Sequence, residues 1–241
     1  MKSLIITPLL FLFVFFCNGQ SSETKIDFDY FLLGTLNDYM GRENHKAIAN
    51  RVDVYHTNNN SLVSLIDSIY RDENPDMILV ANKMNRQELR SESLAQKMND
   101  FFIFKPSGRR VYSGEEDFET LKLNFDSLTK TPDFYATHFD TLFIGHIKDD
   151  IFKNDSEKYS FLTGAFIKYG GKNDSTYFIS MPNSVSKIKV ATELLKELNC
   201  TDIEYIIYRD FIPVGHKVFF KPTDELKKYL EAISEMLNHL N

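Results

Sequence analysis

The spacing of apolar residues changes along this chain, and that change limits the folds that it can adopt. Between residues 27 and 128, apolar side chains recur at three- and four-residue intervals, the period of a helix packed on one face. After Thr131-Pro132, short stretches alternate apolar and polar residues, as strands with one buried face do. The pattern predicts an α+β fold with a helical first half followed by an antiparallel sheet.

The helices predicted in the first half have recognisable starts and ends. Asp27 can cap a helix that runs to Met40, although Gly34 inside it costs about 1 kcal/mol relative to alanine. Ser113 and Glu116 form a capping box, in which each side chain satisfies a free backbone N–H of the first turn. The other expectations here are a short strand at 52–56, a helix opened by Ser61, an ambiguous apolar run at 77–81 and a helical stripe from Leu89 to Phe102.

The second half predicts a ββαββα order with one extra strand before it. Its helices and strands imply an antiparallel sheet covered on one face by two helices. We expect strands at 142–147, 161–169, 176–181, 203–208 and 217–221, and helices opened by Ser184 and Thr223. Two strand-strand-helix units would fit a structural duplication, although the residues show no convincing repeat. The expected organisation is a mostly helical region at 20–135 and an α+β region at 136–241, or one domain containing both.

The N-terminus resembles a cleavable export signal. Lys2 precedes an apolar run from Leu4 to Phe16, whose 13 residues fall short of the roughly 18 needed to cross a membrane as a helix. We predict cleavage after Gly19, so that residues 1–19 are a signal peptide and the mature protein is secreted or periplasmic. Lipid attachment at Cys17 is the less favoured alternative, because that pathway prefers a small residue where Phe16 stands.

Charge and cysteine content narrow the possible partners. Removing residues 1–19 takes away Lys2 alone, leaving 27 Lys and Arg against 34 Asp and Glu. Such a surface is expected to repel phosphate backbones, so nucleic acid is predicted not to be a partner. Cys200 is then the one remaining cysteine, which excludes an intramolecular disulfide and leaves stability to the hydrophobic core.

One group of residues could ligate a metal. His138, Asp140 and His146 combine imidazole and carboxylate, the donors that suit zinc. Their spacing matches no metal motif, and exposed residues around a strand explain them more simply. No nucleophile elbow or phosphate-binding glycine loop occurs either. The sequence therefore predicts no cofactor, no metal and no catalytic residue, with the three residues kept as weak metal candidates.

A cluster of aromatic residues could instead form a partner-binding edge. Tyr205, Tyr208 and Phe211 lie close together near the last predicted strands. The leading hypothesis is an exported, non-catalytic binding protein of the bacterial cell envelope, with an inhibitor that masks a toxin as a special case. The alternative is an envelope hydrolase, possibly metal-dependent, that uses the histidine and aspartate candidates.

Overall fold

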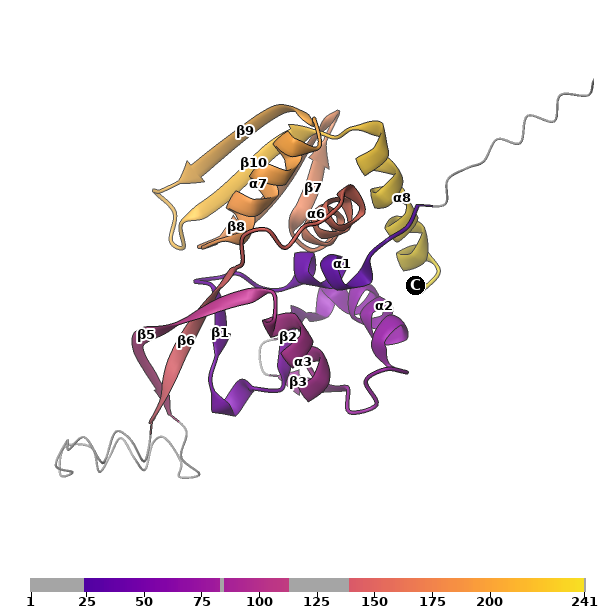
Figure 1. Ribbon diagram of the computed structural model, residues 1–241. Helices are drawn as coiled ribbons and strands as arrows, with labels where there is room; N and C mark the ends of the chain where they lie inside the picture. The colour runs from indigo at the N-terminus through magenta and orange to yellow at the C-terminus, as the bar shows by residue number, and fades with distance from the viewer. Residues whose placement is uncertain (1–23, 83–84, 113–138, 241) are drawn as a thin grey trace, which may run out of the picture.

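The computed structural model describes residues 24–82, 85–112 and 139–240, in which six α-helices and three antiparallel sheets form an α+β fold (Figure 1). The helices are α1 (Phe28–Thr35), α2 (Asn60–Tyr70), α3 (Glu92–Asn99), α6 (Asp155–Tyr169), α7 (Lys187–Glu197) and α8 (Asp224–Asn238), with 3-10 turns η1 (Lys46–Ile48) and η2 (Thr57–Asn59). The strands are β1 (Arg42–Asn44), β2 (Arg51–His56), β3 (Ile78–Asn82), β4 (Arg86–Arg90), β5 (Phe102–Tyr112), β6 (Phe139–Ile147), β7 (Gly170–Asn173), β8 (Thr176–Pro182), β9 (Thr201–Tyr208) and β10 (Gly215–Lys221).

The α+β class is confirmed, but the predicted helical first half is wrong. Five of the strands, β1 to β5, lie before residue 113. The helix expected to reach Met40 stops at Thr35, because Leu36 adopts extended backbone angles. The stripe expected from Leu89 to Phe102 divides into strand, helix and strand. Helical spacing over a few residues is therefore overridden here by strand pairing, which depends on partners distant in sequence.

The strand predicted at 161–169 is also wrong, because these residues belong to α6. Six consecutive α6 residues, from Ser160 to Ala165, are buried. A helix covered on all sides shows no polar stripe, so its sequence resembles that of a buried strand. The hairpin partner of β8 is instead the short strand β7.

Several predictions fall on residues that the structure does not describe. These are the signal peptide at 1–19, the capping box at Ser113 and Glu116, and the boundary expected near residue 135. Among the described helices, none is long and apolar enough to span a membrane.

The described chain contains the same series of elements twice. The series α1-β1-β2-α2-β3-β4-α3 is repeated as α6-β7-β8-α7-β9-β10-α8. Strand order agrees as well, since β2-β4-β3 in the first unit corresponds to β8-β10-β9 in the second. The units differ at one strand: β7 extends the second sheet beside β8, whereas β1 pairs with β6 in a separate sheet with β5. The duplication is thus larger than the strand-strand-helix unit considered from sequence.

The two units meet where α1 packs against α6. A Cβ atom placed on Gly164 would lie 2.0 Å from the carbonyl oxygen of Phe31, and one on Gly34 would lie 2.1 Å from that of Phe161. The two helix backbones therefore touch directly, which side chains would prevent. Buried residues of both units join one hydrophobic cluster around this contact, including Leu32 and Leu162.

Substituting Gly164 by alanine should destabilise the protein. The added methyl group would overlap the backbone of α1, and such overpacking typically costs about 1–3 kcal/mol, with larger values where backbone must move. The urea midpoint of unfolding should fall accordingly. Gly108→Ala is the matched control, because its added methyl group meets no atom within 4 Å. Equal midpoints for the two variants would contradict the close contact.

Candidate functional site

A groove lies where the two units meet, and we call it the junction groove. It consists of two adjoining hollows of about 260 and 670 Å³ that share Asn37, Tyr39, Val54 and Arg86. The first unit supplies the segment after α1 and strands β2 and β4. The second unit supplies Lys168, Tyr169 and Pro182, at the ends of α6 and β8. The larger hollow is therefore a product of the helix contact, since both units line it, whereas the smaller hollow is lined by the first unit alone.

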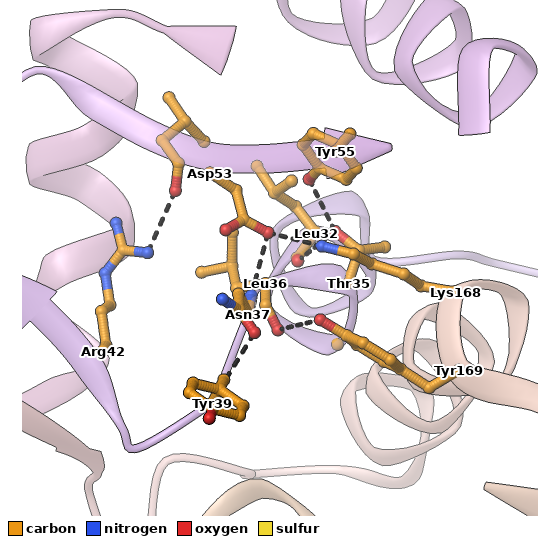
Figure 2. Close-up of polar contacts among 12 residues, drawn as sticks. Leu32, Thr35, Leu36, Asn37, Tyr39, Arg42, Asp53, Tyr55, Lys168 and Tyr169 are labelled. Carbon is orange, nitrogen blue, oxygen red and sulfur yellow. Dashed lines mark hydrogen bonds and ion pairs between the residues drawn. The ribbon is translucent and has the colours of Figure 1, made fainter. Parts of the chain in front are cut away.

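A buried ion pair crosses from one unit to the other beneath the groove (Figure 2). The Lys168 ammonium lies 2.7 Å from Oδ2 of Asp53, and both side chains are less than a tenth exposed. The same carboxylate oxygen accepts a hydrogen bond from the backbone N–H of Asn37 at 2.9 Å. Burial lowers the pKa of Lys168, and the neighbouring carboxylate of Asp53 opposes that effect.

Tyrosine side chains complete the floor of the groove. The Tyr169 hydroxyl donates to the carbonyl of Leu36 at 3.2 Å, and the Tyr55 hydroxyl lies 3.0 Å from that of Thr35 (Figure 2). The Lys168 ammonium also sits 4.1 Å from the centre of the Tyr55 ring. Burial raises the pKa of both tyrosines well above the usual value, so both remain neutral hydrogen-bond donors.

The buried side chain of Arg42 lines one wall of the groove. It is only 6 % exposed, donates to the carbonyl of Val52 at 3.0 Å and to the side chain of Asn99 at 2.7 Å, and lies over the Phe102 ring. Burial lowers its pKa to about 10, a value at which the guanidinium is still charged at neutral pH. Its structural contacts leave it little freedom to follow a ligand.

Two further buried charged residues, Asp38 and Lys187, connect the end of α1 with the start of α7. One oxygen of Asp38, Oδ2, accepts hydrogen bonds from the Ser184 hydroxyl and from the backbone N–H groups of residues 185, 186 and 187, at 2.6–2.9 Å. The carboxylate thus caps the start of α7, where the helix dipole favours negative charge. The fully buried Lys187 ammonium donates to the carbonyls of Gly34 and Leu36 at the end of α1.

The structural repeat reveals a sequence repeat that our sequence analysis missed. Residues 31–41 read Phe-Leu-Leu-Gly-Thr-Leu-Asn-Asp-Tyr-Met-Gly, and residues 161–171 read Phe-Leu-Thr-Gly-Ala-Phe-Ile-Lys-Tyr-Gly-Gly. The two glycines of the helix contact coincide in this alignment, as do Tyr39 and Tyr169. Asp38 and Lys168 then occupy equivalent positions. A comparison of the chain with itself could have found this signal.

The metal candidates from the sequence do not form a described cluster. His138 lies outside the described residues, whereas Asp140 and His146 both lie on β6. Six residues of strand separate these two by about 20 Å, too far for a shared ion. Asp140 instead lies 3.8 Å from the Lys46 ammonium. Among the residues that the structure describes, no three His, Cys, Asp or Glu side chains are placed to hold a metal.

The aromatic candidates lie at one end of the four-stranded sheet. Tyr205 and Tyr208 belong to its edge strand β9, and Phe211 follows in the loop to β10. Tyr208 and Phe211 pack edge to face at 5.9 Å, whereas Tyr205 stacks on His216. Because Tyr205 and Tyr208 are three residues apart in a strand, they point to opposite faces of the sheet. All three side chains are exposed, and the partner-binding edge stays a prediction.

Comparison with known proteins finds distant structural likenesses. No protein-family model matches the sequence, and no curated protein matches it. Mesophilic variants of the homing endonuclease I-DmoI match 88 % of this chain and 97 % of theirs, with 14 % identity and a TM-score of 0.42. An I-DmoI variant in complex with its target DNA is 15 % identical, with a TM-score of 0.38. The match covers 88 % of this chain and 97 % of that protein. Full-length DUF199/WhiA from Thermatoga maritima is 12 % identical, with a TM-score of 0.40. The match covers 89 % of this chain and 60 % of that protein.

These neighbours require a correction. The I-DmoI variant is in complex with its target DNA, so nucleic acid is the partner of that protein. The hypothesis of a non-catalytic envelope protein, its secreted or periplasmic location and the exclusion of nucleic acid are therefore withdrawn. TM-scores of this size assign no activity to the present chain, so its function must be argued from its own residues.

Breaking the buried ion pair should be costly. Asp53→Asn leaves the Lys168 ammonium buried without its counter-charge, and removing one partner of such a pair typically costs about 3–5 kcal/mol. The free energy of unfolding, measured by urea titration, should fall by this order. Glu193→Gln serves as control, because it breaks an exposed pair with Lys189 and should leave the midpoint nearly unchanged.

The stability of the fold should depend on pH through Lys187. Burial lowers its pKa from 10.5 to about 7, with Asp38 opposing and Lys168 reinforcing the effect. Between these pH values the unfolded chain binds more protons at this residue, so stability should rise with pH above 7. Lys187→Met should reduce the slope of unfolding free energy against pH by up to about 1.4 kcal/mol per unit. Denaturant titrations at pH 7, 8 and 9 measure it; equal slopes would contradict the assignment.

Proposed function

We propose that this protein binds nucleic acid along the junction groove, with Arg51 and Arg86 contacting the phosphate backbone. The observation that carries the proposal is the local charge of the groove. Four basic side chains line it, and each of its three carboxylates already faces a basic side chain. The basic residues are Arg42, Arg51, Arg86 and Lys168; the pairs are Glu43 with Arg51, Asp53 with Lys168, and Glu88 with Arg90.

The charge of the whole chain, −6, conceals an uneven distribution. The strands carry ten Lys and Arg against six Asp and Glu, whereas the helices carry eight against eleven. Residues 113–138 add six acidic and two basic residues to the total, outside the described part of the chain. Binding of a polyanion depends on the field at the contact surface, so an acidic protein with a basic sheet surface can bind phosphates.

The surroundings of the groove suit an extended ligand. Val54, Arg86 and Glu88 alternate onto one face of the β2-β4-β3 sheet, and His56 lies on the same face opposite Arg86. At the other end, the groove reaches Pro182 at the end of β8. A nucleic acid strand could thus pass from the first sheet to the second while its phosphates remain near basic side chains.

The groove is better suited to binding than to metal-dependent strand cleavage. Two-metal cleavage requires carboxylates that converge on the metal ions. The repeat places Lys168 where the other unit has Asp38, and Asp38 is occupied by four donors at the start of α7. Asp53 is occupied by Lys168 and by the backbone of Asn37. We therefore propose binding without cleavage at this site.

Arg51→Ala and Arg86→Ala should each weaken binding of a short labelled nucleic acid. If each arginine contacts one phosphate, the slope of log affinity against log salt concentration should decrease by about 1 per substitution. Fluorescence anisotropy over a salt series, with a duplex and its separate strand as probes, measures both quantities. Arg51→Lys and Arg86→Lys should retain most of the slope because they keep the charge.

The matched control removes positive charge elsewhere. Lys227→Ala with Lys228→Ala changes two lysines of α8, a helix that does not line the groove, and should leave affinity and slope close to wild type. The proposal fails if the wild-type chain binds neither probe at low salt, or if the α8 variant loses as much affinity as the groove variants.

A further inference from the structure

The four-stranded sheet β7-β8-β10-β9 has one face that no described helix covers. Helices α6 and α7 lie on its other side (Figure 1), where Ile179, Val218 and Phe220 are buried. Side chains alternate along each strand, so Phe178, Lys217 and Phe219 point to the opposite, open face. The structure places these three on β8 and β10, the two central strands of the sheet.

Two aromatic rings sit side by side at the middle of this open face. Phe178 and Phe219 are direct partners in the pairing of β8 with β10, and their ring centres are 6.0 Å apart. Both rings are half-buried. Gly171 of β7 pairs with Phe178 on the side away from β10. A Cβ atom added to Gly171 would lie 2.5 Å from the Phe178 ring, so the ring packs directly on the glycine backbone. We call Phe178 and Phe219 the aromatic platform.

A lysine stands over the aromatic platform. The Lys217 ammonium is 3.8 Å from the centre of the Phe178 ring and 4.9 Å from that of Phe219. No ion pair of Lys217 is found among the described residues. An ammonium held beside two aromatic rings offers the two contacts that a nucleotide requires, a surface for the base and a charge for the phosphate.

We propose that the aromatic platform binds single-stranded nucleic acid, with one base stacked on Phe178, the next on Phe219, and Lys217 contacting the phosphate between them. This inference rests on the proposed function and names the kind of nucleic acid that the protein prefers. Paired bases in a duplex are covered on both faces by their neighbours. Unpaired bases expose a face that can stack on aromatic side chains, which is how single strands are bound on open sheets.

The relative strengths of the two ring contacts favour the ligand. An exposed cation–π contact such as that of Lys217 changes the equilibrium constant for holding the ammonium at the ring by about two- to fivefold. Stacking of a base on an aromatic side chain corresponds to about 5- to 150-fold in affinity. A base can therefore displace the ammonium from the ring, and the ammonium can turn to the phosphate.

The charges beside the platform set the direction of the strand. Glu204 of β9 lies opposite Phe219 on the same face and repels phosphate. Lys217 lies one row further along β10, toward Gly215 and Pro182, which are paired across β8 and β10. Because Pro182 also lines the junction groove, the backbone is expected to run from the platform toward the groove.

Phe178→Ala and Phe219→Ala should each weaken binding of a labelled oligothymidine by about 5- to 150-fold. Binding of a duplex of equal length should change little, because its bases do not reach the rings. Phe219→Tyr keeps an aromatic ring and should retain most of the affinity. Anisotropy with both probes on the full chain measures these effects, and circular dichroism confirms that each variant is folded.

Photocrosslinking of the wild-type chain tests the same contact without a substitution. A single strand carrying 5-iodouracil should crosslink within 176–182 or 215–221, as located by mass spectrometry of the digested protein. Crosslinks confined to 51–56 and 86–90, or alanine variants that bind oligothymidine like wild type, would overturn the platform while leaving the groove proposal intact. Absence of binding to both single strand and duplex would instead refute the proposed function itself.

Discussion

The direct backbone contact between α1 and α6 is the constraint on which the rest of this structure depends. Because Gly34 and Gly164 carry no side chain, the backbone of each helix packs directly against a backbone carbonyl of the other. The ends of both helices are thereby brought to one place. Asn37 and Tyr39 follow the first helix, and Lys168 and Tyr169 end the second, so the junction groove is assembled from segments about 130 positions apart in sequence.

Buried charge around this contact is balanced by hydrogen bonds and partners. Lys168 faces Asp53 across the units, Asp38 satisfies the first turn of α7, and Lys187 donates to carbonyls at the end of α1. A buried charge without such partners would be strongly destabilising. These groups therefore stabilise the arrangement of the units, whereas Arg51 and Arg86 line the groove itself, with Arg51 3.5 Å from the Glu43 carboxylate.

Two kinds of sequence reasoning were misleading here: the net charge of the whole chain and the local spacing of apolar residues. The net charge excluded nucleic acid, yet the basic residues gather on strands and the acidic residues on helices. Local periodicity placed a strand at 161–169, because a helix buried on all sides has no polar stripe to reveal its period. The groove residues were missed because their nearness arises only from the helix contact.

By itself, the sequence determined the α+β class, the amphipathic stripe that becomes α8 and the paired motif of phenylalanine, leucine and glycine that makes the close helix contact possible. Tertiary structure alone decided that α1 and α6 cross, that Asp53 neutralises Lys168, and that Phe178 meets Phe219 on an open sheet face. The physical reason is the separation along the sequence over which each interaction acts. Capping, helical period and glycine's missing side chain act within a few residues, whereas ion pairing, strand register and burial depend on which distant segments meet.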